Sequence, residues 1–283
     1  MFRKLVKAIM PYGIVCLLKR KGSKKVRKVV DYFAKLETND PELIAVKEYI
    51  ALNGFDIFPF YGENDPIYDK SAGMWYVLRG GRKLYFPSNL NGKRVQSYYS
   101  RLLREQDPKS AHRYTVPEFT VKKGDVIADV GAAEAIWALD NVDLASKIYI
   151  FECDTAWIAA LEKTFEPFKS KVEIVQKYVT DNNDANNVTL DAFFADKKID
   201  VIKADIEGAE PKMLKGGAQV LSKNKNLRIS VAVYHRENDA KDCKEILDKA
   251  GYTTKFSNGY MIFIFDKNIK EPYYRRGLLF SHN

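Results

Sequence analysis

The sequence contains 283 residues, of which 46% are hydrophobic and 13% aromatic, and it carries a formal net charge of +9. This is enough apolar material for one large domain with a smaller one beside it. No apolar run reaches the roughly 18–20 residues that a membrane-spanning helix needs. The three cysteines show no metal-site spacing, so we expect free thiols, no bound metal and a cytoplasmic location.

The positive charge is concentrated in an N-terminal arm. Residues 1–28 contain ten lysines or arginines and no acidic residue, whereas the rest of the chain is close to neutral. Apolar side chains at near-helical spacing lie among these charges, which favours a peripheral contact with an anionic membrane surface. A docked terminal helix with a solvated charge run is the main alternative. A nucleic-acid-binding arm is disfavoured because few aromatic residues accompany the charges, and a secretory signal because Pro11-Tyr12-Gly13 interrupts the apolar stretch.

Residues 29–113 are predicted to form a smaller mixed α/β region. Two β-prone runs flank Gly80-Gly81, which predicts a hairpin, and Asp40-Pro41 is expected to break a helix. The expected elements are a helix over 29–60 with that break, a loop over 58–70, hairpin strands over 75–78 and 83–86, and a helix over 95–106.

Residues 114–283 alternate short apolar strands with helical stretches, which predicts a mostly parallel sheet with helices on both faces. The turn signal Ser257-Asn258-Gly259 predicts an antiparallel pair that closes the sheet. The expected strands are 126–130, 148–151, 172–175, 201–203, 227–234, 252–256 and 260–265, and the expected helices are 135–145, 155–164, 190–194, 210–221 and 240–250.

Ligands of open parallel sheets bind at the carboxyl ends of the strands, so the residues there are the first candidates for a site. Gly131 ends the first strand and allows a ligand to approach the backbone closely, with the next helix presenting its N–H groups. Glu152 ends the second strand, 21 positions later, where an acid typically accepts hydrogen bonds from a ribose diol. Tyr178 follows the third strand as a candidate adenine wall. Together these ends predict a nucleoside-cofactor site, and the lack of further glycines after Gly131 disfavours a nicotinamide or flavin.

The residues at these strand ends resemble the FkbM-type methyltransferases. The resemblance rests on the segments 124–132, 151–154 and, above all, Lys203-Ala204-Asp205-Ile206-Glu207-Gly208-Ala209-Glu210. It implies a class I methyltransferase (Rossmann-like) fold whose last strand is antiparallel, with S-adenosylmethionine as donor. The implied activity is O-methylation, often of sugar hydroxyls in surface glycans or of natural products. The expected donor contacts are Asp129, Gly131, Ala132, Glu134, Ala135, Glu152, Asp154, Tyr178 and Asp205, with Ala135 standing where the family usually has glycine.

A base that takes the proton of the acceptor hydroxyl would assist such a transfer. His235, after the fifth strand, is the first candidate because the ordinary pKa of histidine is near 6.5, and Asp205 is the second. Glu207, Glu210 and Arg236 are candidate acceptor contacts. Two rival functions stay open: a binding protein that keeps the fold without transfer chemistry, and a membrane-surface scaffold that acts through residues 1–28.

Overall fold

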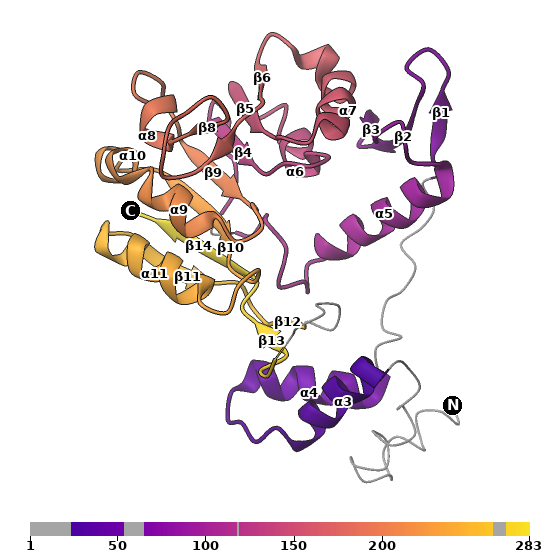
Figure 1. Cartoon of the computed structure of the whole chain (residues 1–283), viewed down its shortest axis with the longest axis vertical. Helices are drawn as coiled ribbons and strands as arrows, with labels where there is room; N and C mark the ends of the chain where they lie inside the picture. Colours follow the sequence, from indigo (N-terminus) through magenta and orange to yellow (C-terminus); the bar gives the residue numbers. More distant parts are fainter. Residues whose placement is uncertain (1–23, 54–64, 118, 263–269) are drawn as a thin grey trace.

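The structure is a computed structural model that describes residues 24–53, 65–117, 119–262 and 270–283. Its centre is a seven-stranded sheet with the strand order β11-β14-β10-β9-β4-β5-β6 (Figure 1). The five strands from β10 to β6 pair in parallel, and β14 is antiparallel to both of its neighbours, so β11 runs in the same direction as those five. This order with its antiparallel β14 is the expected class I methyltransferase fold. The strands are β4 (Val126–Val130), β5 (Lys147–Phe151), β6 (Val172–Val175), β9 (Val201–Ala204), β10 (Arg228–Ala232), β11 (Thr253–Phe256) and β14 (Leu278–His282).

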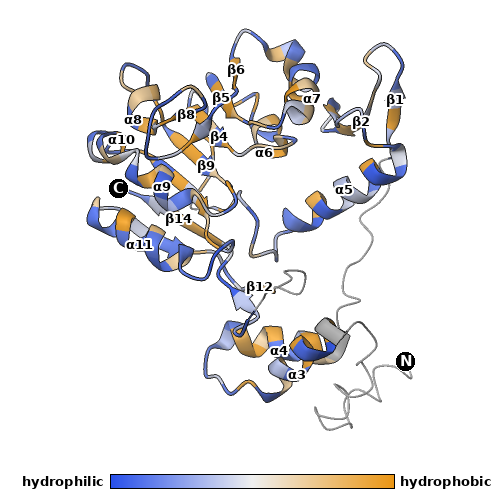
Figure 2. Ribbon diagram, in the orientation of Figure 1, coloured by the Kyte–Doolittle hydropathy of each residue, from blue (hydrophilic) through white to orange (hydrophobic). Residues whose placement is uncertain are grey.

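Helices cover both faces of this sheet, which explains why its central strands are hydrophobic almost throughout (Figure 2). One face packs against α5, α6 and α7, and the other against α8 to α11. These helices are α5 (Gly92–Glu105), α6 (Ile136–Asp140), α7 (Thr155–Phe165, followed by the 3₁₀ turn Glu166–Phe168), α8 (Leu190–Phe193), α9 (Glu210–Lys215), α10 (Ala218–Lys223) and α11 (Asp239–Lys249).

Two of the predicted helices are shorter than expected, for local reasons. The helix expected over 135–145 ends at Asp140, where the side chain of Asn141 donates to the carbonyl of Trp137. The helix expected over 210–221 is divided at Gly216-Gly217, because the Gly216 backbone packs closely against the Thr180 carbonyl.

The region before the sheet contains the predicted hairpin and helices. Strands β2 (Met74–Arg79) and β3 (Arg82–Tyr85) confirm the hairpin, and β1 (Ile67–Asp69) adds a third strand where a loop was expected. Helices α3 (Lys24–Lys35) and α4 (Pro41–Asn53) flank the predicted break. Helix α3 crosses the expected boundary at residue 28, and most of the basic arm lies outside the described residues. Within the described part of the chain, no helix is both long and apolar enough to span a bilayer.

The antiparallel closure of the sheet differs from the prediction in its partners. Strand β11 pairs with β14, which the sequence pattern did not indicate, and not with the segment after Gly259. The chain between them forms a small extension, β12 (Met261–Ile262) and β13 (Tyr274–Arg275), and residues 263–265 of the predicted strand lie outside the described residues. This extension packs against α3 and α4 around Phe33 and Tyr273 (Figure 1). A two-stranded parallel pair, β7 (Tyr178–Val179) and β8 (Asn187–Val188), completes the strands.

Candidate functional site

The strand order of the sheet reverses between β4 and β9, and the predicted site residues converge at the carboxyl ends of these two strands. Gly131, directly after β4, adopts the left-handed φ of +71°. A β-carbon on Gly131 would overlap the carbonyl oxygen of Asp205, directly after β9. Glycine is therefore required here, because it alone lets the two strand-end loops meet.

Glu152, at the end of β5, holds the loop after β4 in place. Its Oε2 accepts a hydrogen bond from the backbone N–H of Ala133 at 2.8 Å. Its Oε1 accepts from the N–H groups of Cys153 at 2.6 Å and Asp154 at 2.9 Å. Each carboxylate oxygen has a second lone pair, so both can also accept from a ligand hydroxyl. Asp154 instead caps α7, accepting from the N–H of Ala156 at 2.8 Å, which explains its place in the sequence without a ligand.

Tyr178 lies at the rim of a cavity of about 280 Å³. Cys153, Gln176 and Asn186 also line this cavity, and Tyr178 has 61% of its surface exposed. A large exposed ring at the rim of a cavity is a suitable wall for a nucleoside base. Of the predicted donor contacts, the structure places Tyr178 at this cavity, together with Cys153, the chain neighbour of Glu152.

The loop 131–135 has a strained backbone. Ala133 and Ala135 have φ values of +46° and +56°, in the region that favours glycine. Ala135 and Ala132 are buried. The left-handed backbone explains why the family usually has glycine at residue 135. Alanine adopts the same φ here at a cost in backbone strain.

Glu134, in the middle of this loop, is buried with 6% of its surface exposed. The hydroxyl of Tyr98 on α5 donates to its Oε2 at 3.4 Å. Burial raises the pKa of Glu134 to about 8. A carboxyl group whose pKa lies close to neutral pH changes its protonation readily when a positive charge arrives nearby, because that charge favours the ionised form.

Asp129, the second-to-last residue of strand β4, is fully enclosed and forms an ion pair with Lys203 of β9 at 2.9 Å. Lys203 also donates to the carbonyl of Gly131 at 3.1 Å. The predicted donor contact of Asp129 is not supported by this position, because only 1% of the residue is exposed. The pair instead fixes the backbone from which Gly131 emerges.

Asp205 is the most heavily hydrogen-bonded carboxylate of the site. Tyr114 and Tyr234 donate their hydroxyls to it, the latter at 3.1 Å, and the Nε2 of His112 lies 3.2 Å from its Oδ2. Burial alone would raise the pKa of Asp205, but contacts with His112 and His235 outweigh it and hold the pKa well below the ordinary value. Asp205 is therefore a stable anion at the centre of the strand ends.

His235, after β10, lies between two carboxylates. Its Nε2 is 3.2 Å from Asp205 Oδ1, and its Nδ1 is 3.2 Å from Glu210 Oε1. Burial alone would lower its pKa, but these carboxylates raise the pKa of His235 to about 10. The argument for His235 as a general base assumed a pKa near 6.5, and the structure corrects it: an imidazolium has no lone pair with which to take a proton.

The three predicted acceptor contacts lie in different surroundings. Glu207 has an exposed side chain on a backbone of left-handed φ, +57°, and its Oε2 is 3.6 Å from His235 Nε2. Arg236 is exposed and crosses Gly208 so closely that a β-carbon there would meet its Nε at 2.6 Å. Glu210 is fully buried and accepts from the N–H of Ile206 at 2.8 Å, so it faces no space that is open to an acceptor.

Two residues of this cluster, His112 and Tyr114, precede the first strand of the sheet and were not predicted as site residues. They lie in an irregular segment of turns that Ser257 anchors, its hydroxyl donating to the Ala111 carbonyl at 2.7 Å. Both side chains contact Asp205: the Tyr114 hydroxyl donates to it, and the Nε2 of His112 lies 3.2 Å from its Oδ2. The spacing His-x-Tyr was the available signal, but nothing in it indicates which face of the segment is buried.

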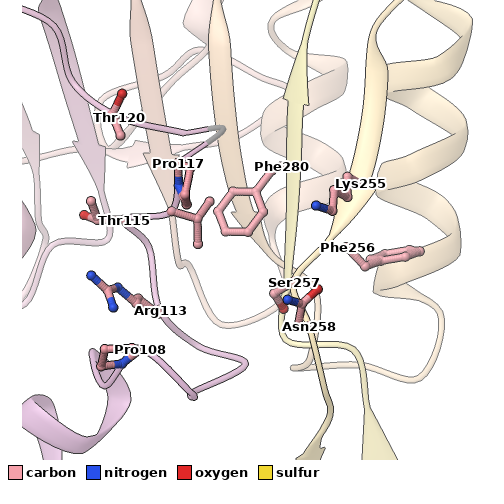
Figure 3. A pocket seen from close by; sticks show the side chains of 11 residues that line it. Pro108, Arg113, Thr115, Pro117, Thr120, Lys255, Phe256, Ser257, Asn258 and Phe280 are labelled. Carbon is pink, nitrogen blue, oxygen red and sulfur yellow. The ribbon is translucent and has the colours of Figure 1, made fainter. Parts of the chain in front are cut away.

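The other side of this segment borders a separate cavity of about 640 Å³ (Figure 3). Arg113 and Thr115 line it together with residues of β11 and β14, including Lys255 and Phe280. None of the predicted site residues lines this cavity. It lies behind the His112–Tyr114 segment and is not the space at the strand ends.

A protein-family model matches part of the chain. Residues 140–254 match the model of the Methyltransferase FkbM domain, which confirms the predicted resemblance over that segment. No curated protein sequence matches the chain.

Several solved methyltransferase structures are similar to parts of this chain at low identity. A methyltransferase FkbM from Methylobacillus flagellatus KT is 18% identical, with a TM-score of 0.46 over 68% of this chain and 55% of that one. A precorrin-6y C5,15-methyltransferase from Geobacter metallireducens GS-15 is 13% identical, with a TM-score of 0.41 over 80% of this chain and all of the other. The Streptococcus pneumoniae protein Sp1610, in complex with S-adenosyl-L-methionine, is 18% identical, with a TM-score of 0.38 over 57% and 67%. This chain thus spans about half the length of the FkbM structure.

Proposed function

We propose that this chain, whose residues 140–254 match the model of the Methyltransferase FkbM domain, is an S-adenosylmethionine-dependent O-methyltransferase. The observation that carries the proposal is the close approach of Gly131 to Asp205. It joins the loop expected to hold the donor to the acid expected to face the acceptor. The acceptor we propose is a sugar hydroxyl of a bacterial surface glycan or of its lipid-linked precursor.

The residues at the strand ends fit this donor. Glu152 would accept from the ribose hydroxyls, and the exposed ring of Tyr178 would cover the adenine. The loop 131–135, with its left-handed backbone, would lie along the methionine part of the donor. The carboxyl group of Glu134 would then be close to the positive charge of the donor. When bound, S-adenosylmethionine supplies an activated methyl group on a sulfonium.

On the acceptor side, Asp205 is the group placed to orient a hydroxyl. Its carboxylate is positioned by Tyr114, Tyr234 and His112, so its oxygens cannot rotate away from the strand ends. Holding the reacting oxygen in line supplies much of the rate in such a transfer. Glu207 and Arg236, both exposed beside Asp205, are the proposed contacts for the rest of the acceptor.

Calorimetric titration of the purified chain with S-adenosylmethionine tests the donor site. We expect saturable binding at one site per chain. Glu152→Ala should weaken it at least tenfold, whereas Glu162→Ala, on the exposed surface of α7, should leave it unchanged. Absence of binding to the wild-type chain would leave the rival function, a binding protein that keeps the fold without transfer chemistry.

The acceptor is tested in the host. Mass spectrometry of surface glycans from cells with and without the gene should differ by one methyl group per repeating unit. Restoration by the wild-type gene and not by an Asp205→Asn gene would tie that methyl group to this site. Identical glycans in both cells would exclude this acceptor class.

For the N-terminal arm we propose a contact with an anionic membrane surface. In support, α3 buries Val29, Val30 and Phe33 against the body, while Arg27 and Lys28 of the same helix are exposed. Co-sedimentation with vesicles of phosphatidylserine and phosphatidylcholine tests it. The full chain should bind and a chain without residues 1–23 should not, and binding should fall as salt rises. Equal binding by both chains would remove this part of the proposal.

A further inference from the structure

The cavity of about 640 Å³ behind the His112–Tyr114 segment has no part in the proposed methyl transfer, yet it is large enough for a small-molecule ligand (Figure 3). Residues of β11 and β14 line one side of it, and the chain from Pro108 to Thr120 lines the other. The chemistry of these two sides indicates which kind of ligand the cavity suits.

The walls of the cavity are held in place by contacts of their own. Ser257 joins the two sides, because its hydroxyl donates to the Ala111 carbonyl at 2.7 Å. Gly277 packs so closely against the same carbonyl that a β-carbon there would overlap it. The Thr120 carbonyl, farther along the chain, accepts from the side chain of Arg228. A ligand would therefore enter a largely preformed site, which lowers the entropic cost of binding.

Much of the lining is apolar. Phe280 of β14 is almost buried, and its ring lies against that of Phe119 at a centroid distance of 5.7 Å. Val116 and Pro117 line the cavity from the other side. Such surface favours a ligand with a hydrocarbon part, because contact between the two removes apolar surface from water.

The charge of the lining is positive. It comes from Arg113 and Lys255, which lie on opposite sides of Phe280 (Figure 3), and none of the described lining residues is acidic. Arg113 is half-buried, and its guanidinium forms no hydrogen bond or ion pair with the residues that the structure describes. A guanidinium partly removed from water and without an anion is an open position for a phosphate or carboxylate, because it can donate to two oxygens at once.

Two cations at one cavity favour a doubly charged head group over a singly charged one. A phosphate monoester carries about −1.5 to −2 charges near pH 7, and so matches Arg113 and Lys255 together. A carboxylate carries a single charge at that pH. A wholly polar anion would leave the side chains of Phe280 and Pro117 uncovered.

We propose that this cavity binds a phosphate monoester that carries an apolar chain. Arg113 binds the phosphate oxygens, and Lys255 supplies the second positive charge. The chain lies against Phe280 and Pro117. This second site goes beyond the proposed function and does not depend on it.

The position of Arg113 in the chain connects this site to the strand ends. Arg113 stands between His112 and Tyr114, both of which contact Asp205. A ligand held by Arg113 therefore restrains the segment that positions this carboxylate. Since coupling between two sites is reciprocal, occupation of the cavity and the arrangement at Asp205 influence each other.

Calorimetric titration of the full-length chain with decyl phosphate, below its micelle concentration, tests the site. We expect saturable binding of one molecule per chain. Inorganic phosphate and the uncharged decyl glucoside each lack half of the ligand, so each should bind at least about tenfold more weakly. Decanoate should also bind more weakly than decyl phosphate, because it carries less charge.

Substitutions in the lining locate the bound molecule. Arg113→Gln should weaken decyl phosphate binding at least about tenfold, and Lys255→Gln about threefold or more. Thr115→Trp keeps both cations but narrows the cavity, so it should weaken binding as well. Lys249→Gln removes the same charge from α11, on the opposite face of the sheet, and should leave binding unchanged.

Two further measurements separate a folding defect from a loss of the site. Circular dichroism shows which variants fold, and decyl phosphate should raise the unfolding midpoint of the wild type but not that of Arg113→Gln. Bound ligand should slow hydrogen exchange in the peptide that covers residues 111–114, and unchanged exchange at saturation would remove the link to Asp205. The proposal is overturned if the wild-type chain does not bind decyl phosphate saturably, if decyl glucoside binds equally well, or if folded Arg113→Gln binds as tightly as the wild type.

Discussion

The backbone of Gly131 lies against the carbonyl oxygen of Asp205, so closely that a β-carbon on residue 131 would overlap that oxygen. This contact joins the loops after β4 and β9 and sets the spacing between the proposed donor and acceptor positions. We therefore expect Gly131→Ala to cost at least about 3 kcal/mol of unfolding free energy, from overlap and left-handed strain together, and to abolish donor binding.

Gly73→Ala is the control for Gly131→Ala. Gly73 has a similar φ, +65°, but a β-carbon there would meet nothing within 4 Å. This variant should cost only about 1–2 kcal/mol, by strain alone, and should bind the donor normally. Denaturant unfolding and calorimetry measure both variants. Similar losses in the two would show that strain, and not the contact with Asp205, accounts for the need for glycine.

Ala135→Gly should stabilise the protein. Ala135 has a φ of +56°, which costs an alanine about 1–2 kcal/mol and a glycine almost nothing. The greater freedom of glycine in the unfolded chain cancels part of this, so we expect a net gain of about 0.5–1 kcal/mol. Ala138→Gly, inside α6, should instead lower the unfolding free energy by about 1 kcal/mol. A loss in the Ala135 variant would contradict the left-handed assignment.

Glu134 should make stability and donor affinity depend on pH. Burial raises its pKa from 4.5 to about 8, so the folded chain keeps a proton that the unfolded chain releases. Stability therefore falls as the pH rises from about 4.5 to 8, by on the order of 5 kcal/mol in total. Glu134→Gln should flatten this dependence in thermal unfolding from pH 5 to pH 9, whereas Glu162→Gln should not.

Donor binding provides a second measurement at Glu134. If the positive charge of the donor favours the ionised carboxylate, binding should release a proton below pH 8. Calorimetry in two buffers of different ionisation enthalpy measures that proton. No release from the wild-type chain, or equal release from Glu134→Gln, would exclude Glu134 as its source.

The ion pair of Lys203 with Asp129 should be costly to break. Both side chains are buried, so Lys203→Met leaves an uncompensated carboxylate and should cost about 3–5 kcal/mol. The double variant Lys203→Met with Asp129→Leu should recover much of that loss, because it removes both charges. Lys147→Met, which breaks a half-exposed pair with Glu173, should cost less than about 1 kcal/mol. A small effect at Lys203 would mean that water reaches this pair.

Much of the fold could be predicted because its parallel strands are buried on both faces and end in polar residues. That pattern located the five parallel strands and placed Gly131, Glu152 and Asp205 together. Strand β14 could not be predicted, because the run Leu278–His282 has no turn signal that relates it to β10. The alternating sequence of β11 was assigned to the wrong partner for the same reason: a turn signal indicates a reversal, not which strand lies alongside.

The site was predicted in outline, and its chemistry was not. The strand-end argument indicates which residues lie near one another, but the state of a titratable group depends on neighbours from other segments. His235 illustrates this, because its pKa is set by Glu210 on α9 and Asp205 after β9. Likewise, Asp129 and Glu210 are polar residues at strand or helix ends, and only the packing around them reveals that both are enclosed.

The position of β14 has a consequence for how the chain folds during synthesis. This strand lies between β10 and β11, yet it follows every other strand of the sheet in the sequence. A ribosome-bound chain that has emerged only to β11 has an unpaired edge on β10 and no partner for β11, so its sheet stays open until the last strand is made. The nascent protein should therefore expose the unpaired edge of β10 from the time that strand emerges until β14 is made. Slow assembly of long-range strand pairs, more than local helix formation, should limit its folding yield. That yield should therefore depend on holdase chaperones.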